Sequence, residues 1–185
     1  RAGSNGAGFV GGVFGAGFFT GHHGLAASMN QRPPAVTANS PAIESTEAPM
    51  AAYVRDRVSE RRWRHIEGVY HTAKALAKQH HADDGKVGVA ALFHDVAREW
   101  SKNELLEYAE KQHIPTRKED RWYPILLHGR IAGEILKNNF RIDDSEINEA
   151  MAYHTSGHPQ MGLLAKILYV ADAVEPGRDY PTRAA

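Results

Sequence analysis

Apolar residues repeat with the spacing of an α-helix through most of this chain, from Met50 to Val174. Ile66, Val69 and Ala73, for example, fall at positions i, i+3 and i+7, which share one face of a helix. No useful run of alternating apolar and polar residues, the pattern of a half-buried strand, interrupts this repeat. A chain that buries its apolar residues along helix faces alone is predicted to fold as an all-α domain.

Capping and helix-breaking residues divide the repeat into separate helices. The helix that contains Ile66 is expected to stop near residues 83–85. Ser101 and Glu104 have the spacing of a capping box, and the helix that they begin should end before Pro115. Three further helices are expected over residues 126–140, 143–154 and 161–174. A length of 185 residues fits one such domain, over residues 50–185.

Residues 1–49 have a different composition and are predicted to be a disordered extension. They contain 9 of the 17 glycines and show neither helical nor strand periodicity. Two other interpretations are a secretory signal whose apolar run is diluted by glycine, and sequence upstream of a natural start at Met50. The segment GAGFVG matches the dinucleotide pattern G-x-G-x-x-G, but no strand precedes it and no amphipathic helix follows, so we treat the match as chance.

Charge and composition exclude several classes of function. The 22 basic residues balance the 22 acidic ones, so no basic field attracts the protein to nucleic acid or to an acidic membrane. No stretch approaches the ~20 apolar residues of a membrane span. Cysteine is absent, which removes disulfides, thiolate metal sites and cysteine nucleophiles. We expect a cytoplasmic protein without nucleic-acid or membrane partners; its oligomeric state is left open, with a homodimer as one option.

Several histidines and aspartates lie on the predicted apolar faces. In AALFHDVAREW, residues 90–100, two ionisable groups directly follow an apolar run. A buried carboxylate is costly unless an arginine, backbone donors or a metal ion compensates for its lost hydration. A single histidine on an apolar face is usually a hydrogen-bonded core residue. Six groups from five helices together predict a metal-binding or substrate-contacting site instead, and their ligand types suit iron, manganese or zinc. They are His65, His94, Asp95, His128, His154 and Asp172.

The order His65, then His94 and Asp95, then Asp172 is the H…HD…D arrangement of the HD phosphohydrolases. Four longer stretches narrow the resemblance: RWRHIEGVYHTA, AALFHDVAR, YHTSGHPQM and KILYVADAVEPGRDYP. Through them the chain resembles, over about residues 53–181, the YqeK family of symmetrical bis(5′-nucleosyl)-tetraphosphatases. The resemblance implies an all-helical HD-domain bundle, a di-iron-type centre and hydrolysis of diadenosine tetraphosphate to two ADP.

The resemblance also implies a role for particular residues. The expected metal ligands are His65, His94, Asp95 and Asp172. The expected catalytic residues are Asp95, Arg98, His128 and His154. The expected substrate contacts are Gly68, Arg98, His128, His154, Thr155 and Arg178. In this scheme one metal ion makes water nucleophilic, and a second, bridged by Asp95, holds the phosphate on which charge develops. Arg98 and Arg178 take the outer phosphates.

Two features depart from the family pattern. Arg98 stands where the family has a lysine, which replaces a point charge by a planar fork that can bind two phosphate oxygens. The family continues for several dozen helical residues after its Glu-Pro-x-Arg segment, so the resemblance implies a domain truncated at its C-terminus. Two alternative functions are an HD nucleotidase acting on another nucleotide phosphate, and a nucleotide-binding module without turnover. The complete ligand set favours an enzyme.

Overall fold

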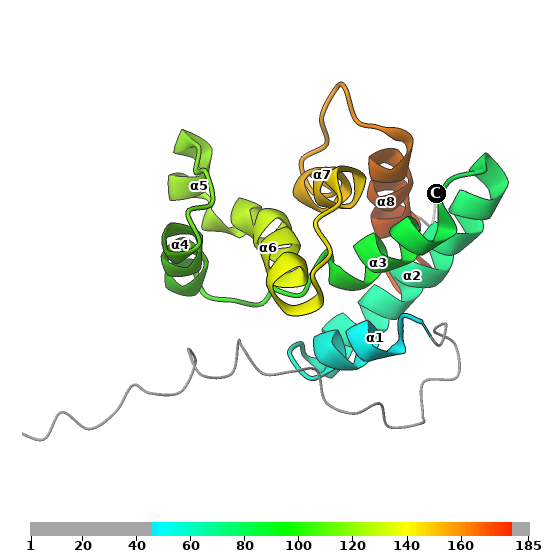
Figure 1. Cartoon of the computed structure of the whole chain (residues 1–185), viewed down its shortest axis with the longest axis horizontal. Helices are drawn as coiled ribbons and strands as arrows, with labels where there is room; N and C mark the ends of the chain where they lie inside the picture. Colours follow the sequence, from blue (N-terminus) through cyan, green and yellow to red (C-terminus); the bar gives the residue numbers. More distant parts are fainter. Residues whose placement is uncertain (1–45, 179–185) are drawn as a thin grey trace, which may run out of the picture. The chain divides into compact units, whose positions relative to one another are not determined.

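Every regular element in the described part of the chain is a helix, as the periodicity predicted (Figure 1). The computed structural model describes residues 46–178. The elements are α1 (Ala48–Arg55), α2 (Glu60–His80), α3 (Asp84–Phe93), α4 (Lys102–Lys111), α5 (Lys118–Trp122), the 3-10 helix η2 (Pro124–Leu127), α6 (His128–Phe140), α7 (Ser145–Tyr153) and α8 (Leu163–Val174).

Short-range hydrogen bonds explain where several helices begin. At the start of α2 the hydroxyl of Ser59 accepts a hydrogen bond from the N–H of Arg62. At the start of α4 the hydroxyl of Ser101 accepts from the N–H of Glu104, while the carboxylate of Glu104 accepts from the N–H of Ser101 at 2.7 Å. The predicted capping box is therefore confirmed. These side chains satisfy backbone donors that the first turn of a helix leaves without partners.

Some boundaries differ from those expected. α1 begins at Ala48, before the expected boundary at residue 50, and the preceding Glu47 is buried. The rest of the predicted extension, residues 1–45, lies outside the described residues. α2 ends at His80, earlier than expected, because His81 adopts a left-handed backbone conformation with φ of 56°.

Two helices carry no periodic signal in the sequence. In α3 every residue from Val87 to Phe93 is buried, so its apolar side chains surround the helix and do not form a stripe. α5 is only five residues long, too short for a period to be recognised. The loop that follows α3, which contains His94 and Asp95, therefore starts from the centre of the core.

Five other helices pack around α3. It contacts α1, α2, α6, α7 and α8, and α2 also packs against α8 (Figure 1). This arrangement brings α3 close to helices that follow much later in the chain, up to α8, which begins at Leu163. It is the feature of the fold that assembles the site described below.

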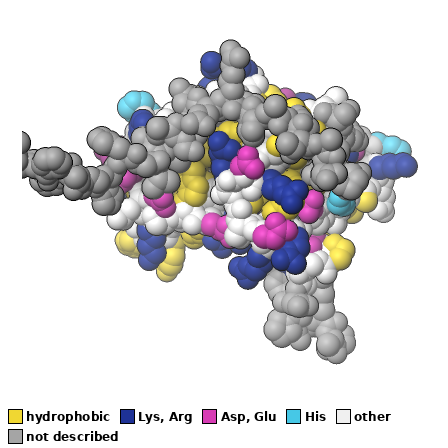
Figure 2. Space-filling model, turned by 90° about the horizontal axis from the view of Figure 1, so that it is seen from below, with side chains coloured by type: hydrophobic (Ala, Val, Ile, Leu, Met, Phe, Trp, Pro, Cys, Tyr) yellow, Lys and Arg dark blue, Asp and Glu magenta, His cyan; other side chains and the backbone are white. Residues whose placement is uncertain are grey.

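One face of the molecule shows charges of both signs. On the face seen in Figure 2, basic side chains lie beside acidic ones, and neither sign forms a separate field. Within residues 46–178 no helix combines the length and the apolar character needed to cross a membrane.

Candidate metal centre

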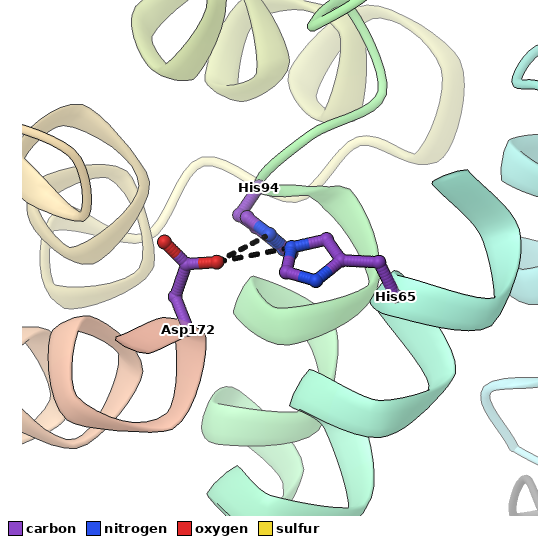
Figure 3. A group of neighbouring side chains, drawn as sticks. All are labelled: His65, His94 and Asp172. Carbon is purple, nitrogen blue, oxygen red and sulfur yellow. Dashed lines mark ion pairs between the residues drawn. The ribbon is translucent and has the colours of Figure 1, made fainter. Parts of the chain in front are cut away.

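Three of the predicted ligands meet at one point in the core. His65 lies in α2, His94 directly follows α3, and Asp172 lies in the last turn of α8; both rings point toward the carboxylate of Asp172 (Figure 3). The Nε2 atom of His65 is 3.0 Å from Asp172 Oδ1, and that of His94 is 3.8 Å from the same oxygen. This separation suits a shared metal ion.

Asp95 connects this group to a second one. Its Oδ2 atom lies 3.6 Å from Nε2 of His65 and 3.5 Å from Nε2 of His94. Its Oδ1 atom lies 3.2 Å from Nε2 of His128 and 3.5 Å from Nε2 of His154. His128 is the first residue of α6, and His154 directly follows α7. The structure thus brings all six predicted groups together, with one carboxylate oxygen of Asp95 facing each pair of histidines.

Backbone carbonyls set the proton position in three of the four imidazoles. Nδ1 of His94 lies 2.7 Å from the carbonyl oxygen of Ala91, and Nδ1 of His154 lies 2.7 Å from that of Met151. Nδ1 of His128 contacts the carbonyl oxygen of Ile125 in the same way. A carbonyl oxygen only accepts hydrogen bonds, so Nδ1 must donate and carry the proton. In the neutral ring this leaves a lone pair on Nε2, directed toward the centre.

His65 is oriented by Glu175, a residue for which the sequence predicted no role. Its Nδ1 atom lies 3.1 Å from Glu175 Oε1, and the carboxylate is almost completely buried, with 1% of its surface exposed. The N–H of Gly177 donates to Glu175 Oε2 at 2.6 Å. One signal could have identified Glu175: it lies three residues after Asp172, and metal-binding histidines commonly donate their second nitrogen to a carboxylate.

Two arginines contact the carboxylates of the centre. Arg62 donates from Nη1 to Asp95 Oδ2 at 2.6 Å, and Arg178 donates from Nη2 to Asp172 Oδ1 at 2.6 Å. Arg178 was expected near the phosphates, whereas Arg62 was not predicted. The position of Arg62 in the sequence could have identified it. It is three residues before His65 and therefore lies on the same face of α2.

Protonation equilibria favour neutral rings at His94 and His128 beside ionised carboxylates. At His65 burial disfavours the charged ring, but contacts with Asp172 and Glu175 outweigh burial and raise the pKa. Burial lowers the pKa of His94 to about 4, although Asp95 opposes this effect, and burial also lowers the pKa of His128. Burial alone would raise the pKa of Asp95, but the imidazoles around it hold that pKa well below its usual value. The pKa of Asp172 is also lowered, because the contact with His65 and neighbouring charges outweighs burial.

The arrangement fits a bound cation. Nε2 of His65 and Nε2 of His94 are buried without a hydrogen-bond partner among the described residues. Nε2 of His128 and Nε2 of His154 lie 3.0 Å apart, although the carbonyl contacts leave each of these atoms as an acceptor. Arg62, Arg178 and Thr155 offer donors to some of these groups. Acceptors still outnumber donors in this buried cluster, which is unfavourable unless a positive charge satisfies them. Nitrogen and oxygen ligands without thiolate suit iron, manganese or zinc.

A cavity of about 940 Å³ opens beside the centre. Three carboxylates of the site and five arginines line it, so that positive charge is in excess. The arginines are Arg61, Arg62, Arg64, Arg98 and Arg178. Planar guanidinium groups bind phosphate oxygens in pairs, and the cavity therefore suits a chain of phosphates.

The cavity includes most of the predicted substrate contacts. Arg98, Thr155 and Arg178 line it, and the hydroxyl oxygen of Thr155 lies 2.9 Å from Nε2 of His154. Gly68 is outside the described lining. A side chain at Gly68 would collide with the carboxylate of Glu175, so the structure gives this glycine a packing role behind His65. His128 contacts the centre but lines a second, smaller cavity.

Comparison with known proteins gives consistent results. The sequence profile of the HD domain matches residues 62–177. The chain is 37% identical over 130 residues to the symmetrical bis(5′-nucleosyl)-tetraphosphatase of Bacillus subtilis, covering 70% of this chain and 69% of that protein. It is 36% identical to the protein of the same name from Halalkalibacterium halodurans, covering 69% and 68%. A crystal structure of a predicted HD superfamily hydrolase involved in NAD metabolism, from Clostridium acetobutylicum, matches with a TM-score of 0.69 and 33% identity, covering 76% of this chain and 74% of that one.

Proposed function

Because the chain belongs to the HD-domain family, among the symmetrical bis(5′-nucleosyl)-tetraphosphatases, we propose that it hydrolyses diadenosine tetraphosphate to two ADP at the centre described above. One observation carries the proposal: a buried set of four imidazoles and two carboxylates, joined through Asp95, opens onto an arginine-rich cavity. Residues of the proposed metal centre and the arginines that can bind phosphate line the same cavity. This combination suits the cleavage of a polyphosphate.

The proposed ligands form two groups that share Asp95. His65, His94 and Asp172 complete one group. His128 and His154, which lie 3.2 and 3.5 Å from Asp95 Oδ1, complete the other. A divalent cation in these positions supplies Lewis-acid chemistry, because it makes water a stronger nucleophile near neutral pH and stabilises negative charge on phosphate oxygens. We propose iron as the native metal, with manganese and zinc as alternatives.

The arginines of the cavity neutralise and position the phosphate chain. Arg62 uses Nη1 for Asp95, while its Nε atom is buried without a hydrogen-bond partner in the described residues. Arg62 also lines the cavity, and a guanidinium carries five N–H donors, so the group retains donor capacity for a phosphate oxygen close to Asp95. Arg98 and Arg178, which line the same cavity, are placed to contact neighbouring phosphates. The leaving group is a weakly basic nucleoside diphosphate, so the site does not require a strong general acid.

A second candidate is hydrolysis of a dinucleotide with a shorter phosphate bridge. The similar hydrolase from Clostridium acetobutylicum is described as involved in NAD metabolism, and NAD contains two nucleosides joined by two phosphates. The bridge of such a dinucleotide could enter the same arginine-lined cavity. Substrate comparison separates this candidate from the tetraphosphate.

The test is product analysis with purified protein of known metal content. Diadenosine tetraphosphate and NAD are supplied separately in ¹⁸O-labelled water, and the products are separated by anion exchange. We expect ADP alone from the tetraphosphate, with one labelled oxygen for every two ADP molecules. ATP and AMP as first products would contradict symmetrical cleavage, and turnover of NAD alone would favour the second candidate.

Two variants link the activity to the centre. Asp95→Asn keeps the shape of the side chain but removes the charge shared by both ligand groups, so turnover should fall by about 100-fold or more. Asp56→Asn changes an exposed carboxylate in the same way outside the site and should leave turnover unchanged. Equal activity of the two variants would exclude Asp95 from the reaction.

A further inference from the structure

A second cavity meets the first one at the metal centre. Its volume is about 240 Å³, and it is enclosed by residues from α5, η2, the start of α6 and the end of α7. His154 and Thr155 line both cavities. The expected ligand His128 also lines the smaller cavity. The two cavities therefore share part of their walls beside the proposed centre.

We propose that the smaller cavity binds one nucleoside of a dinucleoside polyphosphate, while the larger cavity binds the phosphate chain and the other nucleoside. This inference rests on the proposed function, and it adds a binding site for the second end of the substrate. The expected substrate contacts, taken from the sequence, include no residue that would recognise a nucleobase.

The symmetry of the reaction places a nucleoside on each side of the cut. A cut at the central anhydride of four phosphates leaves a nucleoside diphosphate on each side of the reacting atoms. An active site that selects this bond must therefore accommodate a nucleoside at two phosphates' distance in both directions. Because His154 and Thr155 line both cavities, a phosphate chain lying against them is next to both cavities.

The larger cavity has an excess of positive charge, whereas the charges of the smaller cavity balance. The larger cavity has five arginines and three carboxylates in its lining. The smaller one has two arginines and two carboxylates, and Arg130 pairs with the buried Asp120 at 2.5 Å. Polyphosphate favours the cavity with excess positive charge. The balanced cavity suits an uncharged nucleoside.

Size and surface chemistry agree with one nucleoside. Pockets for complete small ligands usually measure about 300–1,000 Å³, so about 240 Å³ suits only part of a dinucleotide. Leu126 provides an apolar wall, and Tyr153 provides an aromatic ring. That ring is held in place by stacking on His158, with centroids 4.7 Å apart and planes inclined by 24°. Aromatic rings held in this way are common stacking surfaces for nucleobases.

The test fills the smaller cavity and compares ligands with one or two nucleosides. Leu126→Trp adds bulk to the cavity wall, and Leu163→Trp is the matched control, because Leu163 is exposed and lines neither cavity. Calorimetry measures binding of adenosine tetraphosphate and of a diadenosine tetraphosphate analogue with a methylene group in place of the central bridging oxygen. Leu126→Trp should weaken binding of the two-nucleoside analogue by roughly 10-fold, the effect of one lost stacking contact. Binding of adenosine tetraphosphate should remain within about 2-fold, because its single nucleoside can occupy the larger cavity.

A second variant keeps the test valid if the added bulk of Leu126→Trp prevents folding. Tyr153→Leu removes the aromatic ring without adding volume and should also weaken the two-nucleoside analogue selectively. Equal weakening of both ligands, or no weakening of either, in a variant whose melting temperature matches that of the control would overturn the inference. Turnover separates this outcome from failure of the proposed function: selective loss of binding without hydrolysis of diadenosine tetraphosphate by the wild-type protein would support the nucleoside site and reject the reaction.

Discussion

At the scale of single residues, the centre depends on groups that orient the ligands. Glu175 is the clearest example, because its buried carboxylate lies 3.1 Å from Nδ1 of His65. A carboxylate in this position fixes the ring orientation and increases the basicity of the opposite nitrogen, Nε2. Gly68 leaves the space that the Glu175 side chain occupies. The basicity of His65 as a metal ligand therefore depends on Glu175 and Gly68, which are not among the proposed metal ligands.

Replacing this carboxylate should weaken metal binding. Glu175→Gln keeps the size of the side chain and an oxygen acceptor but removes the negative charge, so metal affinity should fall by roughly 10-fold or more. Competition with a chromophoric chelator measures the change. Glu107→Gln alters an exposed residue of α4 and serves as the control. An unchanged affinity in Glu175→Gln would mean that the contact with His65 only packs the ring.

At the scale of elements, the capping box of α4 is expected to contribute to the stability of the domain but not to the metal centre. α4 packs against η2 and α6 but contributes none of the proposed ligands. Its first turn depends on reciprocal hydrogen bonds between Ser101 and Glu104. Loss of the cap should therefore lower the stability of the domain without altering the centre.

Ser101→Ala should lower the free energy of unfolding by about 1 kcal/mol, and Ser101→Thr, which keeps the hydroxyl, should lose much less. Urea denaturation measures both. Hydrogen bonds from Ser101 lower the pKa of Glu104, so the cap stabilises the folded state above the usual Glu pKa of 4.5 and loses that contribution as the pH falls further. The difference between Ser101→Ala and wild type should shrink below that pH. Reduced metal content in Ser101→Ala would contradict the independence of α4 from the centre.

At the scale of the whole molecule, the proposed metal connects elements that are far apart in the sequence. Its ligands come from α2, α6 and α8 and from the residues that directly follow α3 and α7. Without a cation, the same residues bring unpaired acceptors and two carboxylates together in the core. Metal binding should therefore stabilise the tertiary structure as well as the site.

Removal of metal by a chelator should lower the melting temperature by roughly 10 °C, since a ligand present at 100 times its dissociation constant contributes about 2.7 kcal/mol of stability. Scanning calorimetry of chelated protein, followed by separate addition of iron, manganese or zinc under anaerobic conditions, measures the loss and identifies the metal that restores it. Asp95→Asn is the control and should respond little to any of them. Equal melting temperatures with and without metal would contradict a cation that joins the helices.

The sequence by itself determined most of the helices and the six groups at the centre. Helical periodicity and capping are local, so the spacing of Ile66, Val69 and Ala73 and the Ser101 cap could be read without knowing the fold. The same periodicity placed His128, His154 and Asp172 on buried faces. The resemblance to a known family then predicted their roles at a metal centre. α3 was not recognised from periodicity because burial on all sides removes the amphipathic signal.

Only the tertiary structure decided how these groups face one another. The two oxygens of Asp95 each serve a different pair of histidines, and Glu175 orients His65; both arrangements depend on how α2, α3 and α8 pack. The role of Gly68 changed for the same reason, since the space beside it is occupied by a residue more than a hundred positions later. The second cavity lies between segments from α5 to α7 and has no local motif. Distances across helices are set by packing of the entire core, which no short stretch of sequence encodes.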